Sequence, residues 1–147
     1  MGVELLSTQT VEYISDATGR LLAITISHEH ETPDTEFMTT SDLNMQVGFI
    51  KYPEGGEIQP HVHLPIERHL VGTGEVLVVR KGKMEVLIFD DDRRLVKKQL
   101  MSTGDILVLV SGGHGFRMLE DTVLMEVKQG PYTGLKEKER FDYDPGK

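Results

Sequence analysis

The sequence feature that most constrains the fold is a series of short apolar runs. From residue 20 onward these runs are rich in β-branched residues, and turn residues interrupt them about every 8 to 12 positions, which is typical of all-β sandwiches and barrels. Helix signals are scarce. We therefore predict an all-β chain with strands at 21–27, 45–52, 75–81, 83–90, 95–100, 105–110 and 122–128.

Turn residues separate the expected strands, in the segments DATG, PEGG, RKGK, DDDRR, STGD and SGG. Gly82 lies between two of the runs and predicts a tight hairpin there. The run at 83–90 carries apolar side chains on both of its faces, which suggests that one face lines a barrel interior and the other meets a neighbouring sheet or subunit. We accordingly expect a homodimer. The first 40 residues and the charged tail give no firm prediction.

Length and composition favour a single domain over residues 1–147. Apolar residues make up 38% of the chain, which is enough to bury a core. The formal net charge is -8 and the basic residues are dispersed, so nucleic acid is not an expected partner. No long apolar run or leader is evident, so we expect a cytoplasmic protein without a membrane partner.

The chain has no cysteine, so any transition-metal site must use histidine and carboxylate ligands. His61 and His63 lie two residues apart, and such residues point to the same face of an extended chain. Two neighbouring imidazoles can bind one ion, although a His-x-His pair can also lie free on the surface. Glu75 opens an expected strand, and His114 follows a glycine pair after another. Three imidazoles and one carboxylate suit a first-row transition metal.

These residues resemble the two motifs of the cupin superfamily. The first motif is a glycine, five residues, His-x-His, a gap, a glutamate, six residues and a glycine, and it is matched here by Gly55, His61, His63, Glu75 and Gly82. The second motif is similar to residues 104–114, although its proline is missing and Met118 stands where the family has asparagine. The resemblance covers about residues 44–129 and implies that this core is a double-stranded β-helix, or jelly-roll barrel, with one divalent Fe, Mn, Ni or Zn ion near its open end.

Two glutamates compete for the carboxylate position. The usual spacing of the motif favours Glu67, because eleven residues separate His63 from Glu75. Glu67 lies in a segment broken by Pro65, however, whereas Glu75 begins an uninterrupted strand. We predict Glu75 as the ligand and keep Glu67 as the alternative. The intervening residues are expected to form a loop at the barrel mouth.

Several other side chains are candidates for the surroundings of the site. His69 is either a further imidazole or a solvated loop residue, and Gln59 is a candidate partner of His61. Phe116 is a candidate wall residue, and Glu126 and Lys128 share one face of the last strand. We expect the second His-x-His pair, at His28 and His30, to be solvated.

The cupin resemblance implies several functions, because this fold carries many chemistries. The first prediction is a metal-dependent enzyme that acts on a small polar molecule, as an oxygenase, isomerase or lyase. The second is a protein that binds a sugar or another small molecule without turnover. The third is a metal-free sugar-nucleotide epimerase or isomerase with His61 or His63 as its base.

Overall fold

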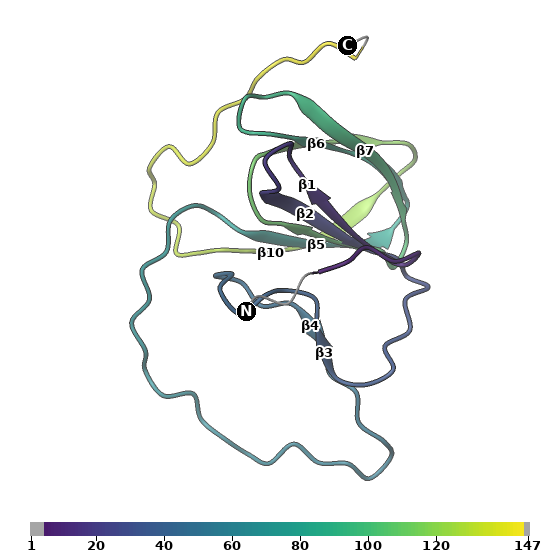
Figure 1. The fold of residues 1–147 in the computed structure, drawn as a ribbon, viewed down its shortest axis with the longest axis vertical. Coiled ribbons are helices and arrows are strands. Elements are labelled where there is room, and N and C mark those ends of the chain that lie inside the picture. Colours follow the sequence, from purple (N-terminus) through teal and green to yellow (C-terminus); the bar gives the residue numbers. More distant parts are fainter. Residues whose placement is uncertain (1–4, 146–147) are drawn as a thin grey trace. The chain divides into compact units, whose positions relative to one another are not determined.

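The computed structural model of the protein describes residues 5–145, and its strands form an all-β, antiparallel structure (Figure 1). These residues include no helix, and hence none that could cross a membrane. The prediction of an all-β chain is confirmed. The described chain forms two compact units: unit 1 contains residues 31–72 and Leu5, and unit 2 contains residues 6–30 and 73–145. The single domain remains a prediction.

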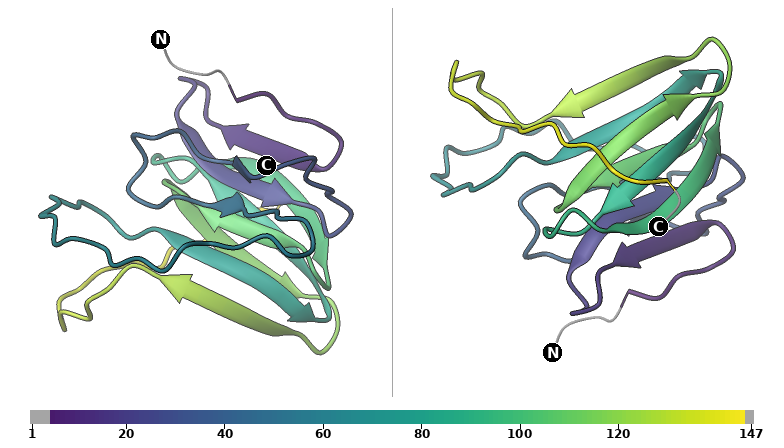
Figure 2. Two further views of the ribbon diagram at one scale, coloured as in Figure 1. Left: turned by 90° about the horizontal axis from the view of Figure 1, so that it is seen from below. Right: turned by 90° about the horizontal axis from the view of Figure 1, so that it is seen from above.

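Unit 2 contains a five-stranded antiparallel sheet, in which β10 is the yellow-green strand at one edge (Figure 2). Its strand order is β1 (Val11–Ser15), β2 (Leu21–Ile26), β8 (Ile106–Leu109), β5 (Glu75–Lys81) and β10 (Val123–Lys128). The register places Leu77 of β5 opposite Leu107 on one side and opposite Glu126 on the other. Directly opposed residues share a face of the sheet, so these three side chains point the same way.

Unit 2 also contains a three-stranded antiparallel sheet. Its strand order is β7 (Leu95–Ser102), β6 (Lys83–Phe89) and β9 (Gly113–Met118). In this sheet Ile88 of β6 lies opposite His114 of β9. An ion pair of 2.7 Å between Lys97 of β7 and Glu12 of β1 joins an edge of this sheet to an edge of the five-stranded sheet.

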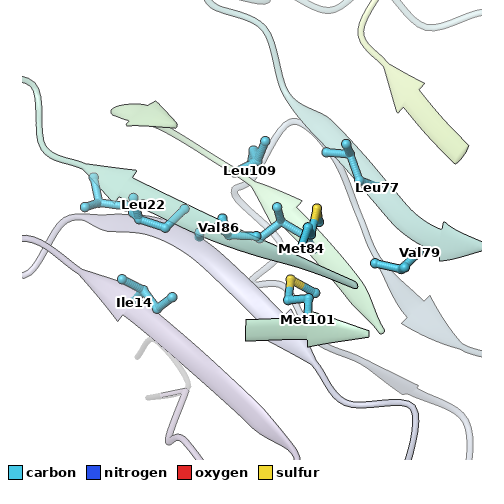
Figure 3. Packing of buried hydrophobic residues seen from close by; sticks show 11 residues of the cluster. Ile14, Leu22, Leu77, Val79, Met84, Val86, Met101 and Leu109 are labelled. Atoms are coloured by element: carbon cyan, nitrogen blue, oxygen red, sulfur yellow. The ribbon is translucent and has the colours of Figure 1, made fainter. Parts of the chain in front are cut away.

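The two sheets of unit 2 enclose one apolar core, which Figure 3 shows from close by. Most strands contribute alternate side chains to this core, because alternate residues of a strand share a face, whereas β2 contributes the neighbours Leu22 and Ala23. Burial of one such aliphatic side chain contributes about 1.5–3 kcal/mol to folding. We call this face of each sheet the inner face. The core residues, each at most 4% exposed, are Ile14, Leu22, Ala23, Leu77, Val79, Met84, Val86, Ile88, Met101, Leu107 and Leu109.

Gly82 carries the chain from one sheet to the other. Its φ is 102°, and a Cβ at this position would lie 2.5 Å from the carbonyl oxygen of Asp121, so only glycine fits without strain. The strand before it, β5, pairs with β8 and β10, whereas the strand after it, β6, pairs with β7 and β9. The predicted turn is present, but the predicted hairpin is wrong because the kink separates the two strands into facing sheets.

Most predicted strands are confirmed, with small shifts at their ends: those at 21–27, 75–81, 83–90, 95–100, 105–110 and 122–128. The sequence did not predict β1 or β9. Strand β9 reads GHGFRM and has little apolar character. It forms because the main chain of β6 has hydrogen-bonding groups along both edges, and β9 supplies partners along one of them.

Unit 1 contains a short antiparallel ladder between β3 (Glu36–Phe37) and β4 (Gly48–Phe49). The strand predicted at 45–52 is wrong in extent, since only two of its residues pair. The side-chain amide of Gln46 donates hydrogen bonds of 2.9 and 2.8 Å to the carbonyls of Thr40 and Leu43. These bonds hold the residues between Thr40 and Gln46 in a loop. Within the predicted strand, the ladder is therefore confined to residues that follow Gln46. Residues 50–72 contain no strand in the structure.

Candidate functional site

The inner face of unit 2 changes from apolar to polar toward one end. On β5, Glu75 continues the row of inward side chains that includes Leu77. On the neighbouring edge strand, Lys128 lies directly opposite Glu75, and Glu126 lies opposite Leu77. On the facing sheet, His114 lies opposite the core residue Ile88. We call Glu75, His114, Glu126 and Lys128 the polar end.

His114 and Glu75 form the closest polar contact at this end. The His114 Nε2 atom lies 3.3 Å from Glu75 Oε2, although the two residues come from facing sheets. The Glu75 side chain is 13% exposed and that of His114 is 34% exposed, so solvent reaches mainly the imidazole. Phe116 stacks on His114, with ring centroids 5.5 Å apart and an angle of 26° between the rings. An imidazole and a carboxylate are therefore held together where the core ends.

Burial lowers the pKa of His114 below its ordinary value of 6.5. The carboxylates of Glu75 and Glu126 act in the opposite direction, and the ammonium of Lys138 adds to the lowering. Because burial is the largest of these effects, the imidazole of His114 is neutral at neutral pH. A neutral imidazole has a nitrogen lone pair that can bind a metal ion or accept a proton.

We expect this lowered pKa to make unit 2 less stable in mild acid. The unfolded chain takes up a proton at this imidazole near pH 6.5, whereas the folded chain takes it up only at lower pH. The stability linked to neutral His114 is complete above about pH 6.5 and is lost as the pH falls toward the folded-state pKa. The free energy of unfolding of metal-free protein, measured at several pH values, should fall less steeply for His114→Gln than for the wild type. An equal fall in the free energy of unfolding for both proteins would contradict the lowered pKa of His114.

The two predicted histidines of unit 1 also lie close together. The ring centroids of His61 and His63 are 5.2 Å apart, and the rings meet edge to face at 72°. The His61 Nδ1 atom lies 2.9 Å from the backbone carbonyl oxygen of Gln59. A carbonyl only accepts hydrogen bonds, so Nδ1 carries the hydrogen and Nε2 is the ring nitrogen left for a metal ion. Gln59 is thus a partner of His61 through its backbone, whereas the prediction concerned its side chain.

The structure therefore brings the predicted ligands together in two pairs, His61 with His63 in unit 1 and Glu75 with His114 in unit 2. Within neither unit do three histidine, aspartate or glutamate side chains of residues 5–145 group closely enough to hold an ion. The donor types nevertheless fit a first-row transition metal, because neutral imidazole and carboxylate are the ligands that such metals take. A site with four ligands stays a prediction.

Glu67 and His69 lie in the part of unit 1 that contains no strand, and both side chains are exposed. Glu75, by contrast, is the first residue of β5, as its uninterrupted apolar run predicted. The strand ladder between β5 and β8 fixes the backbone of Glu75, and Leu109 lies opposite it. Glu75 also contacts another predicted ligand, because its Oε2 atom lies 3.3 Å from Nε2 of His114.

Two features of unit 2 were not predicted from the sequence. Lys138, in the charged tail, lies close enough to His114 to influence its pKa, and no local pattern marks it. The prediction that His28 is solvated is confirmed, since its side chain is 47% exposed, but His28 and the half-buried His30 also hydrogen-bond within unit 2. The Nδ1 atom of His28 lies 2.8 Å from the nearly buried carboxylate of Asp105, and that of His30 lies 2.8 Å from the hydroxyl of Thr10. The turn residues Gly104 and Asp105, directly before β8, were the sequence signal that could have indicated the contact with His28.

Comparisons with protein-family models, with curated proteins and with solved structures found no match to this chain.

Proposed function

We propose that this chain is a metal-binding protein of the cupin type and that it holds one divalent transition metal ion through His61, His63, Glu75 and His114. The observation that carries the proposal is the contact of 3.3 Å between His114 and Glu75 at the polar end. Both side chains are largely withdrawn from solvent at the end of an apolar core, where a polar group costs free energy unless it is paired. The two facing antiparallel sheets support the further proposal that the fold is a jelly roll.

The state of the imidazoles agrees with this proposal. Metal ligands must be deprotonated, and burial already keeps His114 neutral by lowering its pKa. The hydrogen bond from His61 Nδ1 to the Gln59 carbonyl fixes the ring's tautomer, as the outer partners of metal-bound histidines do.

We propose further that the protein acts on a small polar molecule. When bound, a divalent metal with open coordination positions polarises a carbonyl, carboxylate or hydroxyl group, or, as Fe(II), activates dioxygen. The residues of the chain orient the reactants. Glu126 and Lys128 flank the ligand pair on the same face and offer one acceptor and one donor. Phe116 supplies an apolar wall by stacking on His114.

The experiment that tests the proposal is elemental analysis of tag-free protein that was purified without added metal. We expect about one transition metal ion per chain, because such sites bind tightly. Protein that contains none, and that takes up no Fe, Mn, Ni or Zn when these ions are supplied without oxygen, would contradict the proposal. A chelated sample of wild-type protein serves as the blank.

The same contact supports a second candidate function, which is proton transfer without metal. A neutral imidazole with a carboxylate at 3.3 Å can take a proton from a substrate, while the carboxylate stabilises the resulting cation. This version of the metal-free isomerase uses His114 as the base in place of His61 or His63. Removal of the metal distinguishes the two candidate functions. A metal-dependent enzyme loses its turnover in metal-free protein, whereas an enzyme that transfers protons through His114 keeps it.

A further inference from the structure

Strand β10 forms one edge of the five-stranded sheet (Figure 2), because among the residues that the structure describes it pairs with β5 alone. The main-chain N–H of Gln129, directly after β10, donates a hydrogen bond of 3.0 Å to the carbonyl of Gly74. The direction of these bonds alternates along a strand, so Val127 also bonds toward β5, whereas the main-chain groups of Glu126 and Lys128 point away from the sheet. Such an edge can pair with a strand of another chain.

The outer face of this edge, opposite to the inner face, is apolar and open to solvent. Val123, Met125 and Val127 alternate along β10 and are 55%, 53% and 50% exposed. On the neighbouring strand, Val78 lies opposite Met125, and Val76 lies opposite Val127. Directly opposed residues share a face, so these side chains form one apolar stripe across the edge. An exposed stripe of this kind is typical of a surface that another protein chain covers.

The inner face of the same strand carries two opposite charges, which make the edge complementary to itself. Glu126 and Lys128 are exposed and lie two residues apart, so they share a face. A second copy of β10 that runs antiparallel can bring Lys128 opposite Glu126 on both sides of a two-fold axis. Registers that place Glu126 opposite Glu126, or Lys128 opposite Lys128, bring like charges together, which is destabilising. The charges therefore favour pairing with a second copy in one register.

We propose that the protein is a homodimer in which β10 of one copy pairs antiparallel with β10 of a second copy, centred on Val127. In this register Val127 lies opposite Val127 of the second copy, on the two-fold axis, and the apolar stripes of the two copies meet there. Glu126 and Lys128 of the other copy are a hydrogen-bonded pair, since both direct their main-chain groups outward. The interface is isologous, and it joins the two five-stranded sheets edge to edge. It needs no metal ion and does not depend on the proposed function.

The proposal places the homodimer expected from the sequence on a different strand. That expectation came from the run at 83–90, which has apolar side chains on both faces. Val86 and Ile88 of this run lie in the core. Leu87 and Phe89, on the other face, are also buried within the chain itself. Strand β10, by contrast, keeps its apolar outer face exposed, so a second copy can cover it.

The first test is the mass of the wild-type protein in solution, measured by sedimentation equilibrium over a range of concentrations. We expect a dimer in equilibrium with a monomer. Lys128→Glu and Glu126→Lys each place like charges opposite one another in the proposed register, twice per dimer by symmetry. Each should therefore raise the Kd of the dimer about tenfold or more. Lys98→Glu makes the same change of charge on the exposed edge strand β7 and should leave the Kd unchanged.

A mixture of the two charge variants separates a lost interface from a damaged fold. When Lys128→Glu protein meets Glu126→Lys protein, every opposed pair again joins opposite charges. We expect the mixture to form a heterodimer about as tightly as the wild type forms its dimer. A wild type that is monomeric at every concentration would overturn the proposal. Charge variants that dimerise as tightly as the wild type would also overturn it, and so would a mixture that stays monomeric.

A single introduced cysteine tests the register, because the chain has no cysteine of its own. Residue 127 lies opposite its counterpart in a pair without hydrogen bonds, where the Cα atoms are about 4.5 Å apart. A disulfide can span this distance. We expect Val127→Cys to form a disulfide-linked dimer on mild oxidation. Met125→Cys should not, since Met125 lies opposite Gln129 of the other copy. Cross-linking of Met125→Cys in preference to Val127→Cys would overturn the proposed pairing.

Discussion

Replacing His114 with alanine is expected to lower the affinity for a divalent transition metal by more than about 100-fold. Changing a residue that only supports a metal ligand already costs about 10- to 100-fold, so removing a ligand should cost more. His114 is the imidazole whose environment is best defined, because it contacts Glu75 at 3.3 Å and stacks on Phe116. The measurement is competition against a metal chelator of known affinity, under anaerobic conditions for Fe(II).

Three further variants make this result specific. His61→Ala and His63→Ala should each lower the affinity to a similar extent, because the proposed ion uses both. His69→Ala removes an exposed histidine from the same segment of unit 1 and should leave metal binding unchanged. If His114→Ala abolishes binding while His61→Ala and His63→Ala retain it, the site belongs to unit 2 alone and the four-ligand proposal is wrong.

Replacing Glu75 with glutamine should likewise remove most metal binding, whereas the same change at Glu67 should not. The amide that replaces the carboxylate has no charge and is a poor ligand for a transition metal. Both substitutions keep the size of the side chain, so packing in β5 and in the loop is preserved. Metal content after dialysis, measured beside the wild type, reports the difference. Loss of metal in Glu67→Gln alone would assign the carboxylate to unit 1.

The Glu75 variant has a second readout that needs no metal. The carboxylate of Glu75 raises the pKa of His114 and thereby offsets part of the lowering caused by burial. Its removal should shift the pKa of His114 further down in metal-free protein, which proton NMR of the imidazole can follow. Glu67→Gln should leave this pKa in place. An unchanged pKa in Glu75→Gln would mean that the two side chains do not interact in solution.

The strands of unit 2 were predictable because their signal is local. Each run combines alternating or continuous apolar residues with turn residues at both ends, and burial of those residues drives strand formation. Strand β9 lacks this local signal, since GHGFRM owes its extended shape to the hydrogen bonds of β6 and not to its own composition. The segment 45–52 contains apolar residues, but only Gly48 and Phe49 find a partner strand.

The candidate site was predictable in its parts. Glu75 could be preferred to Glu67 because the strand that it opens is visible in the sequence, and β5 does begin there. The pairing of His114 with Glu75 could not be derived from spacing, because 38 residues lie between them and the chain crosses between the sheets on the way. The approach of the tail to His114 depends on aromatic contacts with Phe89 that no local pattern shows.

The sequence by itself determined the secondary-structure class, the turn at Gly82 and the types of ligand available, because strand periodicity, backbone conformation and coordination chemistry are properties of the residues. Only the tertiary structure decided that β5 and β6 belong to different sheets, that Glu75 meets His114, and that the imidazole of His114 is kept neutral. The physical reason is that pairing across sheets and desolvation arise from residues far apart in the chain, whose approach depends on the packing of the whole core.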